Sequence, residues 1–113
     1  MTLKRVITEF GTGNDLHGGD YTKAAVRAVQ DAIHHSSLTL IRNLGIDAAT
    51  MQVEVTIGAQ QPARIDLAAV KAVLPHGEVS VKAVKGGLDV PDDDGRDTAI
   101  IATAAVTVRI ELA

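Results

Sequence analysis

The sequence contains no cysteine and no tryptophan, and Phe10 and Tyr21 are its only aromatic residues. The lack of cysteine excludes disulfides, thiolate catalysis and cysteine-ligated zinc, and it fits a reducing compartment such as the cytoplasm. Two aromatic residues cannot form a platform on which bases stack, and a net charge of −3 supplies no basic surface for a polyanion. We therefore expect no nucleic-acid partner.

Long apolar runs are also absent. No segment approaches the roughly 18 apolar residues of a membrane-spanning helix. The first ten residues, MTLKRVITEF, begin with positive charge but lack an apolar stretch of secretory length. The sequence therefore predicts a cytoplasmic protein with no membrane partner.

What the sequence does contain is a high proportion of small apolar residues. The 113 residues are 46% hydrophobic, mostly alanine and valine, and we expect one domain over residues 1–113. A core of such side chains is thin, so helices must approach the sheet closely to fill space. A homo-oligomer that covers more surface is the expected assembly.

Hydrophobic periodicity predicts four strands and two helices. The expected strands are residues 6–10, 51–57, 78–85 and 98–112, and the expected helices are residues 21–44 and 67–74. Asp20 and Asp66 are suitable N-caps, Gly45 is a suitable C-cap, and Gly11 is expected to end the first strand. The segment DVPDDDGRD, residues 89–97, has the composition of a solvated loop.

The order β-α-β-α-β-β predicts an α+β fold with a mixed four-stranded sheet. Strand–helix–strand units join parallel strands, whereas the short connection between the last two strands suggests a hairpin. Three strands carry polar residues at alternate positions, so we expect both helices on one face of the sheet. These polar residues are Gln52, Glu54, Ser80, Lys82, Thr107, Arg109 and Glu111. The second face is either solvated or buried in a polar subunit contact.

This order of elements resembles the topology of the small trimeric enzymes with the chorismate-mutase-like fold, which the enamine/imine deaminase family shares. In those proteins the sheets meet around a three-fold axis, and the active sites lie between subunits. The resemblance implies a similar architecture, but it does not indicate a reaction, because one fold supports many functions.

The stretch EFGTGNDLHGGD, residues 9–20, is the strongest candidate for a functional site. It is expected to join the carboxyl end of a parallel strand to a helix N-terminus, where α/β sheets usually bind ligands. Glycine lets backbone N–H groups approach a ligand, and a helix N-terminus favours negative charge. We therefore expect a small molecule bearing a carboxylate or phosphate to bind here. The residues expected to hold it are Gly11, Gly13, Gly18 and Asp20.

A nucleotide cofactor is not expected at this stretch. Gly11 and Gly13 begin a G-x-G, but Leu16 replaces the third glycine of the dinucleotide fingerprint, and no Gly-Lys-Ser/Thr follows. Any other cofactor is unknown from the sequence, and a divalent metal is possible.

His17 is the residue best suited to chemistry at the loop. It is expected to act as a general acid or base, with Asp15 orienting its ring and Glu9 as an alternative base. No nucleophilic serine or cysteine stands out, so proton transfer such as isomerisation, a lyase reaction or hydration fits better than acyl transfer.

Two alternatives to this interpretation stay open. Asp15 and His17, with Glu9 or Asp20, could ligate a divalent metal, as in a metal-dependent hydrolase. The chain could also be a non-catalytic module for ligand binding or assembly, in which Asp15 and Asp20 make only turn and cap hydrogen bonds. The sequence does not decide whether the protein is an enzyme.

A G-x-G-x-D-x-H-G motif is formed by Gly11, Gly13, Asp15, His17 and Gly18. It resembles the N-terminal signature of a family of small conserved proteins of unknown function. The similarity continues through VTIGAQQPARID, LPHGEVSVKAVKGGL and AAVTVRIEL, so it covers nearly the whole chain. The resemblance favours a site at the loop and implies no particular activity.

Overall fold

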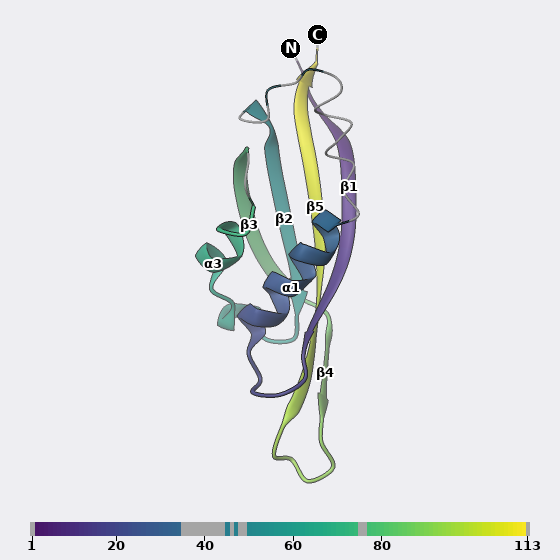
Figure 1. Ribbon diagram of the computed structural model, residues 1–113, viewed down its shortest axis with the longest axis vertical. Coiled ribbons are helices and arrows are strands. Elements are labelled where there is room, and N and C mark those ends of the chain that lie inside the picture. Colours follow the sequence, from purple (N-terminus) through teal and green to yellow (C-terminus); the bar gives the residue numbers. More distant parts are fainter. Residues whose placement is uncertain (1, 35–44, 46, 48–49, 75–76, 113) are drawn as a thin grey trace.

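A computed structural model describes residues 2–34, 45, 47, 50–74 and 77–112 (Figure 1). The elements are β1 (Thr2–Asp15), α1 (Tyr21–His34), β2 (Gln52–Ala59), the 3-10 helix η2 (Pro62–Arg64), α3 (Leu67–Lys71), β3 (Glu78–Lys85), β4 (Leu88–Pro91) and β5 (Thr98–Leu112). The α+β class and the mixed sheet are confirmed. The sheet has five strands rather than four, because β4 lies partly within the predicted loop 89–97 and pairs with β5.

The long strand β5 lies at the centre of the sheet. The strand order is β1-β5-β2-β3, and β4 also pairs with β5. β5 runs antiparallel to β1, β2 and β4, whereas β2 and β3 are parallel. The hairpin expected between residues 78–85 and 98–112 is wrong, because β3 pairs with β2 and the short β4 forms the hairpin with β5. At Gly87 the backbone passes so close to β5 that a Cβ would lie 2.2 Å from the Ile101 carbonyl oxygen.

Strand β1 continues past the glycine that was expected to end it. It pairs with β5 from Thr2 to Asp15, so the predicted end at Gly11 is wrong. The backbone of α1 lies directly over the strand here. A Cβ on Gly11 would lie 2.3 Å from the Ala28 carbonyl oxygen, and a Cβ on Gly13 would lie 2.2 Å from the Ala28 nitrogen. These glycines permit close packing within a strand and do not mark a turn.

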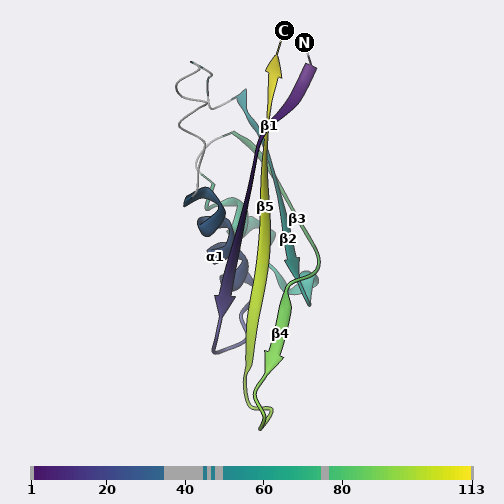
Figure 2. The same cartoon turned by 90° about the vertical axis from the view of Figure 1, so that its right-hand side faces the viewer.

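Both α-helices of the described chain lie on one face of the sheet, as the sequence predicted (Figure 2). α1 faces the sheet with alanine and valine, and these small side chains let it pack close to β1 and β5. Its fully buried residues are Ala24, Ala25, Ala28, Val29 and Ala32. The opposing sheet face contributes alternate residues of each strand, among them Val55, Ile57, Ile100 and Val108.

Both predicted N-caps are confirmed. Asp20 Oδ1 accepts the Lys23 N–H at 3.0 Å, and Asp66 accepts the N–H groups of Ala68 and Ala69. α3 ends at Lys71 rather than Leu74, because the next turn is closed by i to i+3 hydrogen bonds of the 3-10 type.

The described part of α1 ends at His34, and residues 35–44 of the predicted helix lie outside the described residues. Gly45, the predicted C-cap, has a φ of +71°, which suits glycine, but the helix end that it would cap is also outside them. Within the described chain, no helix has the length and apolar character needed to cross a membrane.

β1 lies at the edge of the sheet, and side chains of α1 form hydrogen bonds with some of its backbone groups. Asp31 Oδ2 accepts the Thr12 N–H at 2.9 Å, and Arg27 Nη1 donates to the Asn14 carbonyl oxygen at 2.7 Å. Such contacts make the edge less available to a further strand.

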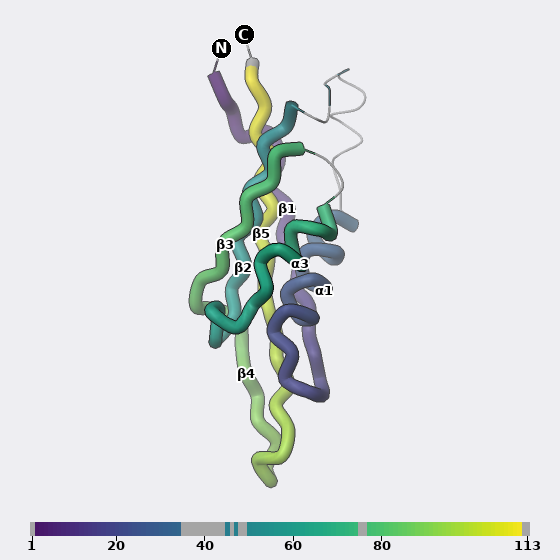
Figure 3. The backbone as a smooth tube through the Cα atoms, turned by 90° about the vertical axis from the view of Figure 1, so that its left-hand side faces the viewer, coloured from purple at the N-terminus to yellow at the C-terminus, as the bar shows by residue number. Residues whose placement is uncertain are grey.

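No helix of the described residues lies on the second face of the sheet (Figure 3). Its central and upper part is polar, as predicted, and includes an ion pair of Arg109 Nε with Glu54 Oε1 at 3.2 Å. Apolar side chains are exposed as well: Leu88 and Val90 on β4, and Phe10 on β1, opposite Ala105 in the middle of β5. Of this face, only the polar residues were predicted from the sequence.

Candidate functional site

Three strands end together at one end of the sheet. β1 ends at Asp15, β2 at Ala59 and β3 at Lys85. β1 and β2 both run antiparallel to β5, and β3 runs parallel to β2, so the three strands point the same way. The loop 16–20 leaves β1 here and enters α1. It therefore lies at a strand carboxyl end, as expected, but the expected parallel neighbour is wrong, because among the described strands β1 pairs only with the antiparallel strand β5.

Asp15 holds this loop to the strand. Its side chain is buried, with Oδ2 accepting the Asp20 N–H at 2.9 Å and Oδ1 3.7 Å from Arg27 Nη1. The expectation that Asp15 orients His17 is wrong. The alternation of β1 directs Asp15 toward the side covered by α1, whereas the loop directs His17 toward solvent.

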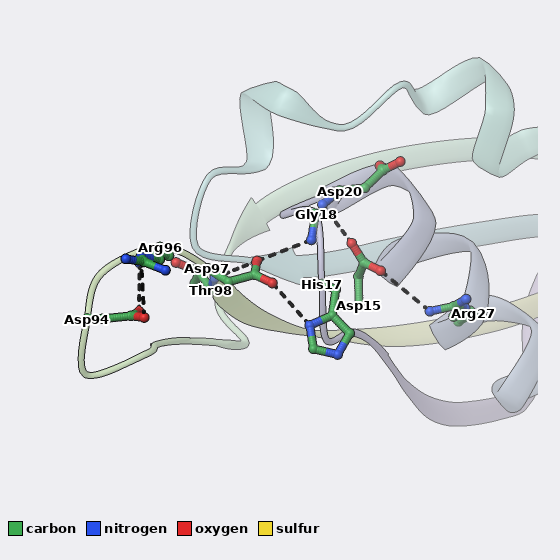
Figure 4. A network of polar contacts seen from close by, with 9 residues as sticks. All are labelled: Asp15, His17, Gly18, Asp20, Arg27, Asp94, Arg96, Asp97 and Thr98. Atoms are coloured by element: carbon green, nitrogen blue, oxygen red, sulfur yellow. Dashed lines mark hydrogen bonds and ion pairs between the residues drawn. The ribbon is translucent and has the colours of Figure 1, made fainter.

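His17 is oriented by Asp97, a residue 80 positions later in the chain (Figure 4). His17 Nδ1 and Asp97 Oδ2 lie 3.1 Å apart, and 87% of the His17 side chain is exposed. Asp97 Oδ1 also accepts the N–H groups of Gly18 at 3.2 Å and Thr98 at 2.9 Å. The hydrogen bond from His17 and these two backbone N–H groups lower the pKa of the Asp97 carboxyl below its ordinary value.

Two backbone donors of the loop, at Gly18 and Asp20, already have acceptors. Gly18 and Gly19 have φ values of +95° and +63°, which glycine adopts without strain. The Gly18 N–H donates to Asp97, and the Asp20 N–H donates to Asp15. The expected role of these two N–H groups, holding a ligand anion, is therefore filled in this structure by the chain's own carboxylates.

Three other predicted site residues lie away from the loop. Gly11 and Gly13 are strand residues under α1. Glu9 pairs with Val106 in mid-strand, six residues before Asp15, which is about 20 Å along a strand. The structure therefore brings together His17, Gly18 and Asp20 with Asp15, but not Glu9, Gly11 or Gly13.

A second polar cluster lies at the start of α1, and the sequence analysis missed it. The hydroxyl of Tyr21, which is buried, donates to Asp89 Oδ2. The Arg64 guanidinium lies over the tyrosine ring, 4.9 Å from its centroid. Burial, followed by the hydrogen bond to Asp89, raises the pKa of the Tyr21 phenol above its ordinary value. The other carboxylate oxygen, Asp89 Oδ1, is buried without a hydrogen-bond partner among the described residues.

Asp97 and Asp89 both belong to segment 89–97, whose composition predicts a solvated loop. Each reaches the start of α1 only through the pairing of β4 with β5. One feature of the sequence could have indicated this cluster. Tyr21 is the single tyrosine and directly follows the N-cap Asp20.

A metal site is not formed by the described side chains. No group of three or more His, Asp or Glu residues in the described ranges is placed to share an ion. Asp15 and His17, the expected ligands, face different partners. An open hollow lined by Pro91, Asp92, Asp93 and Asp94 lies at the tip of the β4–β5 hairpin, and these residues do not include any of the loop.

Comparison with known proteins places the chain among uncharacterised relatives. A family model described as a conserved hypothetical protein, Lin0512_fam, matches residues 5–108. The chain belongs to this family. The expected membership of a conserved family of unknown function is thereby confirmed.

A solved structure is similar to this Lin0512_fam chain. It is a crystal structure of an FtsZ-like protein of unknown function from Nostoc punctiforme, with 38% sequence identity, coverage of 99% of each chain and a TM-score of 0.86. No curated protein matched. Neither match indicates an activity for this Lin0512_fam chain.

Proposed function

We propose that the protein binds a small anionic molecule beside the loop 16–20 and transfers a proton to or from it through His17. Asp97 takes the orienting role that the sequence gave to Asp15. The observation that carries the proposal is the contact of His17 Nδ1 with a carboxylate in a side chain that is otherwise 87% exposed.

This contact leaves the second ring nitrogen for a ligand. A carboxylate on Nδ1 favours the tautomer with its proton there, so Nε2 is the basic nitrogen. The lowered pKa of Asp97 keeps that carboxyl ionised near neutral pH, which also stabilises the imidazolium that forms when His17 takes a proton. Histidine is the side chain best suited to such exchange at neutral pH.

Two arginines near His17 support an anionic ligand. Arg27 and Arg96 are drawn on either side of the ring in Figure 4, with side chains 46% and 86% exposed. Each lies 3.7 Å from its carboxylate, Asp15 and Asp94 respectively. The Arg96 contact is loose and can be exchanged for a ligand carboxylate or phosphate, which a guanidinium binds well. Arg27 is held more firmly, because its Nη1 also donates to the Asn14 carbonyl oxygen at 2.7 Å.

The reaction that fits these groups is an isomerisation. His17 Nε2 takes a proton from the bound molecule and returns it at a neighbouring atom, so no co-reactant is consumed. Acyl transfer is less suitable, because no serine or cysteine stands beside His17 as a nucleophile in the described contacts. The lack of cysteine supports a cytoplasmic location for this activity.

A second candidate function is supported by the way Asp97 joins distant segments. One carboxylate holds both His17 and Gly18, which fastens the loop 16–20 to the β4–β5 hairpin. In this alternative His17 is an assembly or folding element without a ligand.

Thermal melting with a panel of small carboxylates and phosphates tests the proposal. A ligand at about 100 times its Kd adds about 2.7 kcal/mol to the free energy of unfolding. We expect at least one compound to raise the Tm of the wild type and of His34→Ala, an exposed histidine at the far end of α1. The same compound should not raise the Tm of His17→Ala.

The two candidates give different results in this experiment. If no compound shifts the wild type and His17→Ala melts at a clearly lower temperature, the ligand proposal is wrong and the fastening role is supported. If His17→Ala melts like the wild type and only its ligand response is lost, the fastening role is wrong.

A further inference from the structure

Two carboxylates of the β4–β5 hairpin contact residues that lie four positions apart in the sequence. Asp97, directly before β5, contacts His17 in the loop 16–20, and Asp89, in β4, accepts a hydrogen bond from the Tyr21 hydroxyl. Tyr21 is the first residue of α1, the helix that the loop enters. The hairpin is therefore attached at two points to the junction of loop and helix, and the contact at Tyr21 lies outside the site proposed above.

Strand β4 depends on this second attachment. In the sheet it pairs with β5 and with no other described strand, and the tip of the hairpin extends beyond the other described elements (Figure 1). A two-stranded hairpin alone is marginally stable in water. Leu88 and Val90 are exposed, whereas Asp89 lies opposite the buried Ile100 and so projects toward the helix side. The contact of Asp89 with Tyr21 therefore joins β4 to α1.

Strand pairing connects the position of Asp89 to that of Asp97. Asp89 lies opposite Ile100, which is three residues from Asp97, or about 10 Å along the strand. Between these positions the two strands are paired, and the Asp92 N–H donates to the Asp97 carbonyl oxygen at 2.8 Å. A shift of β4 away from α1 would therefore also move the Asp97 carboxylate relative to His17.

The Asp89 carboxylate needs the Tyr21 hydroxyl in order to stay buried. Its other oxygen, Oδ1, is buried without a hydrogen-bond partner among the described residues, so the carboxylate relies on the tyrosine as its donor. Removing one partner from a buried, charged hydrogen bond leaves a charge without compensation, which is strongly unfavourable. Water can solvate that charge if β4 moves away from α1. Loss of the hydroxyl is therefore expected to displace the hairpin.

We propose that Tyr21 is a positioning residue for the His17 site, an inference that rests on the function proposed above. The Tyr21 hydroxyl holds Asp89, and the hairpin that carries Asp89 places the Asp97 carboxylate at His17 Nδ1. Tyr21 is 3% exposed, so it acts without touching a ligand. The position of the proton on the His17 ring thus depends on a buried residue of α1.

NMR of the His17 ring nitrogens in Tyr21→Phe tests this proposal, at a pH where the ring is neutral and with no ligand present. The wild type should carry its proton on Nδ1, which faces Asp97. In Tyr21→Phe we expect this preference to be lost. The pKa of Asp97 should also rise toward its ordinary value of 3.8, because the hydrogen bond from His17 is the largest cause that lowers it.

Val70→Ala is the control for general destabilisation. Val70 is fully buried in α3, so its truncation leaves a cavity in the core without touching the hairpin contacts of Tyr21 and His17. We expect this variant to keep the wild-type proton position and the wild-type Asp97 titration. Circular dichroism should show that each variant compared is folded.

A double variant separates the stranded charge from the lost hydroxyl. Tyr21→Phe combined with Asp89→Val leaves no carboxylate without a donor, and valine suits a strand. We therefore expect the Nδ1 preference of His17 to return. This variant also keeps the proposal testable if Tyr21→Phe alone does not fold.

Three results would overturn the proposal. They are a wild-type proton position in Tyr21→Phe, an equal loss of the preference in Val70→Ala, and a folded double variant that lacks the preference. The fate of the proposed function is measured separately. If the wild-type ring responds to no carboxylate or phosphate, that function is wrong, while the ligand-free spectrum of Tyr21→Phe still decides whether Tyr21 positions the ring.

Discussion

The Tyr21 hydroxyl and the Asp89 carboxylate share a buried hydrogen bond at the start of α1, and the pair can be followed by titration. Burial and this bond both hold the phenol in its protonated form, so its pKa is raised above the ordinary value of 10.0. A raised pKa in the folded state contributes stability that is present below pH 10 and is lost as the pH rises through the folded value.

Because Tyr21 is the only tyrosine, the ultraviolet absorbance of tyrosinate reports this residue alone. We expect its ionisation midpoint to lie above pH 10 in the wild type. Asp89→Asn should lower the midpoint only in part, because burial is the larger cause. A midpoint at or below 10 in the folded protein would show that Tyr21 is not buried against Asp89.

The pKa of the Asp97 carboxyl is shifted in the opposite direction, below its ordinary value. Its pKa lies below the ordinary value of 3.8, mainly because of the hydrogen bond from His17. The stabilisation is therefore present above about pH 3.8 and is lost as the pH falls through the lowered value.

In a carboxyl titration followed by NMR, His17→Ala should raise the Asp97 pKa toward 3.8, because its largest cause is removed. His34→Ala, at the far end of α1, should leave the Asp97 titration unchanged. An Asp97 titration that is the same in the wild type and in His17→Ala would mean that the two side chains are not in contact in solution.

At the scale of elements, the closeness of α1 to β1 explains two positions of the motif. Gly11 and Gly13 have no room for a Cβ because helix backbone atoms lie where it would be. A backbone obstacle cannot turn away as a side chain can, so the helix itself would have to move.

We therefore expect Gly13→Ala to lower the free energy of unfolding by about 3 kcal/mol, the upper part of the range for overpacking. Thr12→Ala is the control, because Thr12 is exposed on the opposite face of the same strand. Urea denaturation measures both. A loss for Gly13→Ala no larger than that for Thr12→Ala would contradict the close packing of α1 on β1.

Elements whose bounds depend on the residues within them were predictable from the sequence. The alternation of β3 and β5 gave their bounds, and Asp20 and Asp66 cap the helices that follow them. The predicted end of β1 was wrong because Gly11 does not terminate the strand. It makes room for the helix backbone at Ala28, 17 residues later. The amino-acid composition around Gly11 does not indicate that contact.

The site was predictable only in part. The loop position and His17 followed from glycine content and strand order. The partner of His17 did not, because an Asp-x-His spacing suggests a local pair while strand alternation buries Asp15 on the other side. Asp97 lies 80 residues from His17 in the sequence and reaches it through the hairpin of β4 with β5. This pairing was not predicted, because the aspartates and Pro91 of the segment are typical of a loop.

At the scale of the whole molecule, the two faces of the sheet differ in what covers them. One face is buried under α1 and α3, while no described helix lies on the other. The loop 16–20 lies at one end of the sheet, where β1, β2 and β3 also end.

The measurement that tests the central claim most directly is NMR of the His17 ring nitrogens during titration with small carboxylates and phosphates. We expect Nδ1 to carry the proton shared with Asp97, and the Nε2 resonance to shift saturably with at least one compound. His34 serves as the internal control and should not respond. If every compound leaves the His17 ring unchanged, or moves His34 equally, the loop is not the ligand site proposed for this protein.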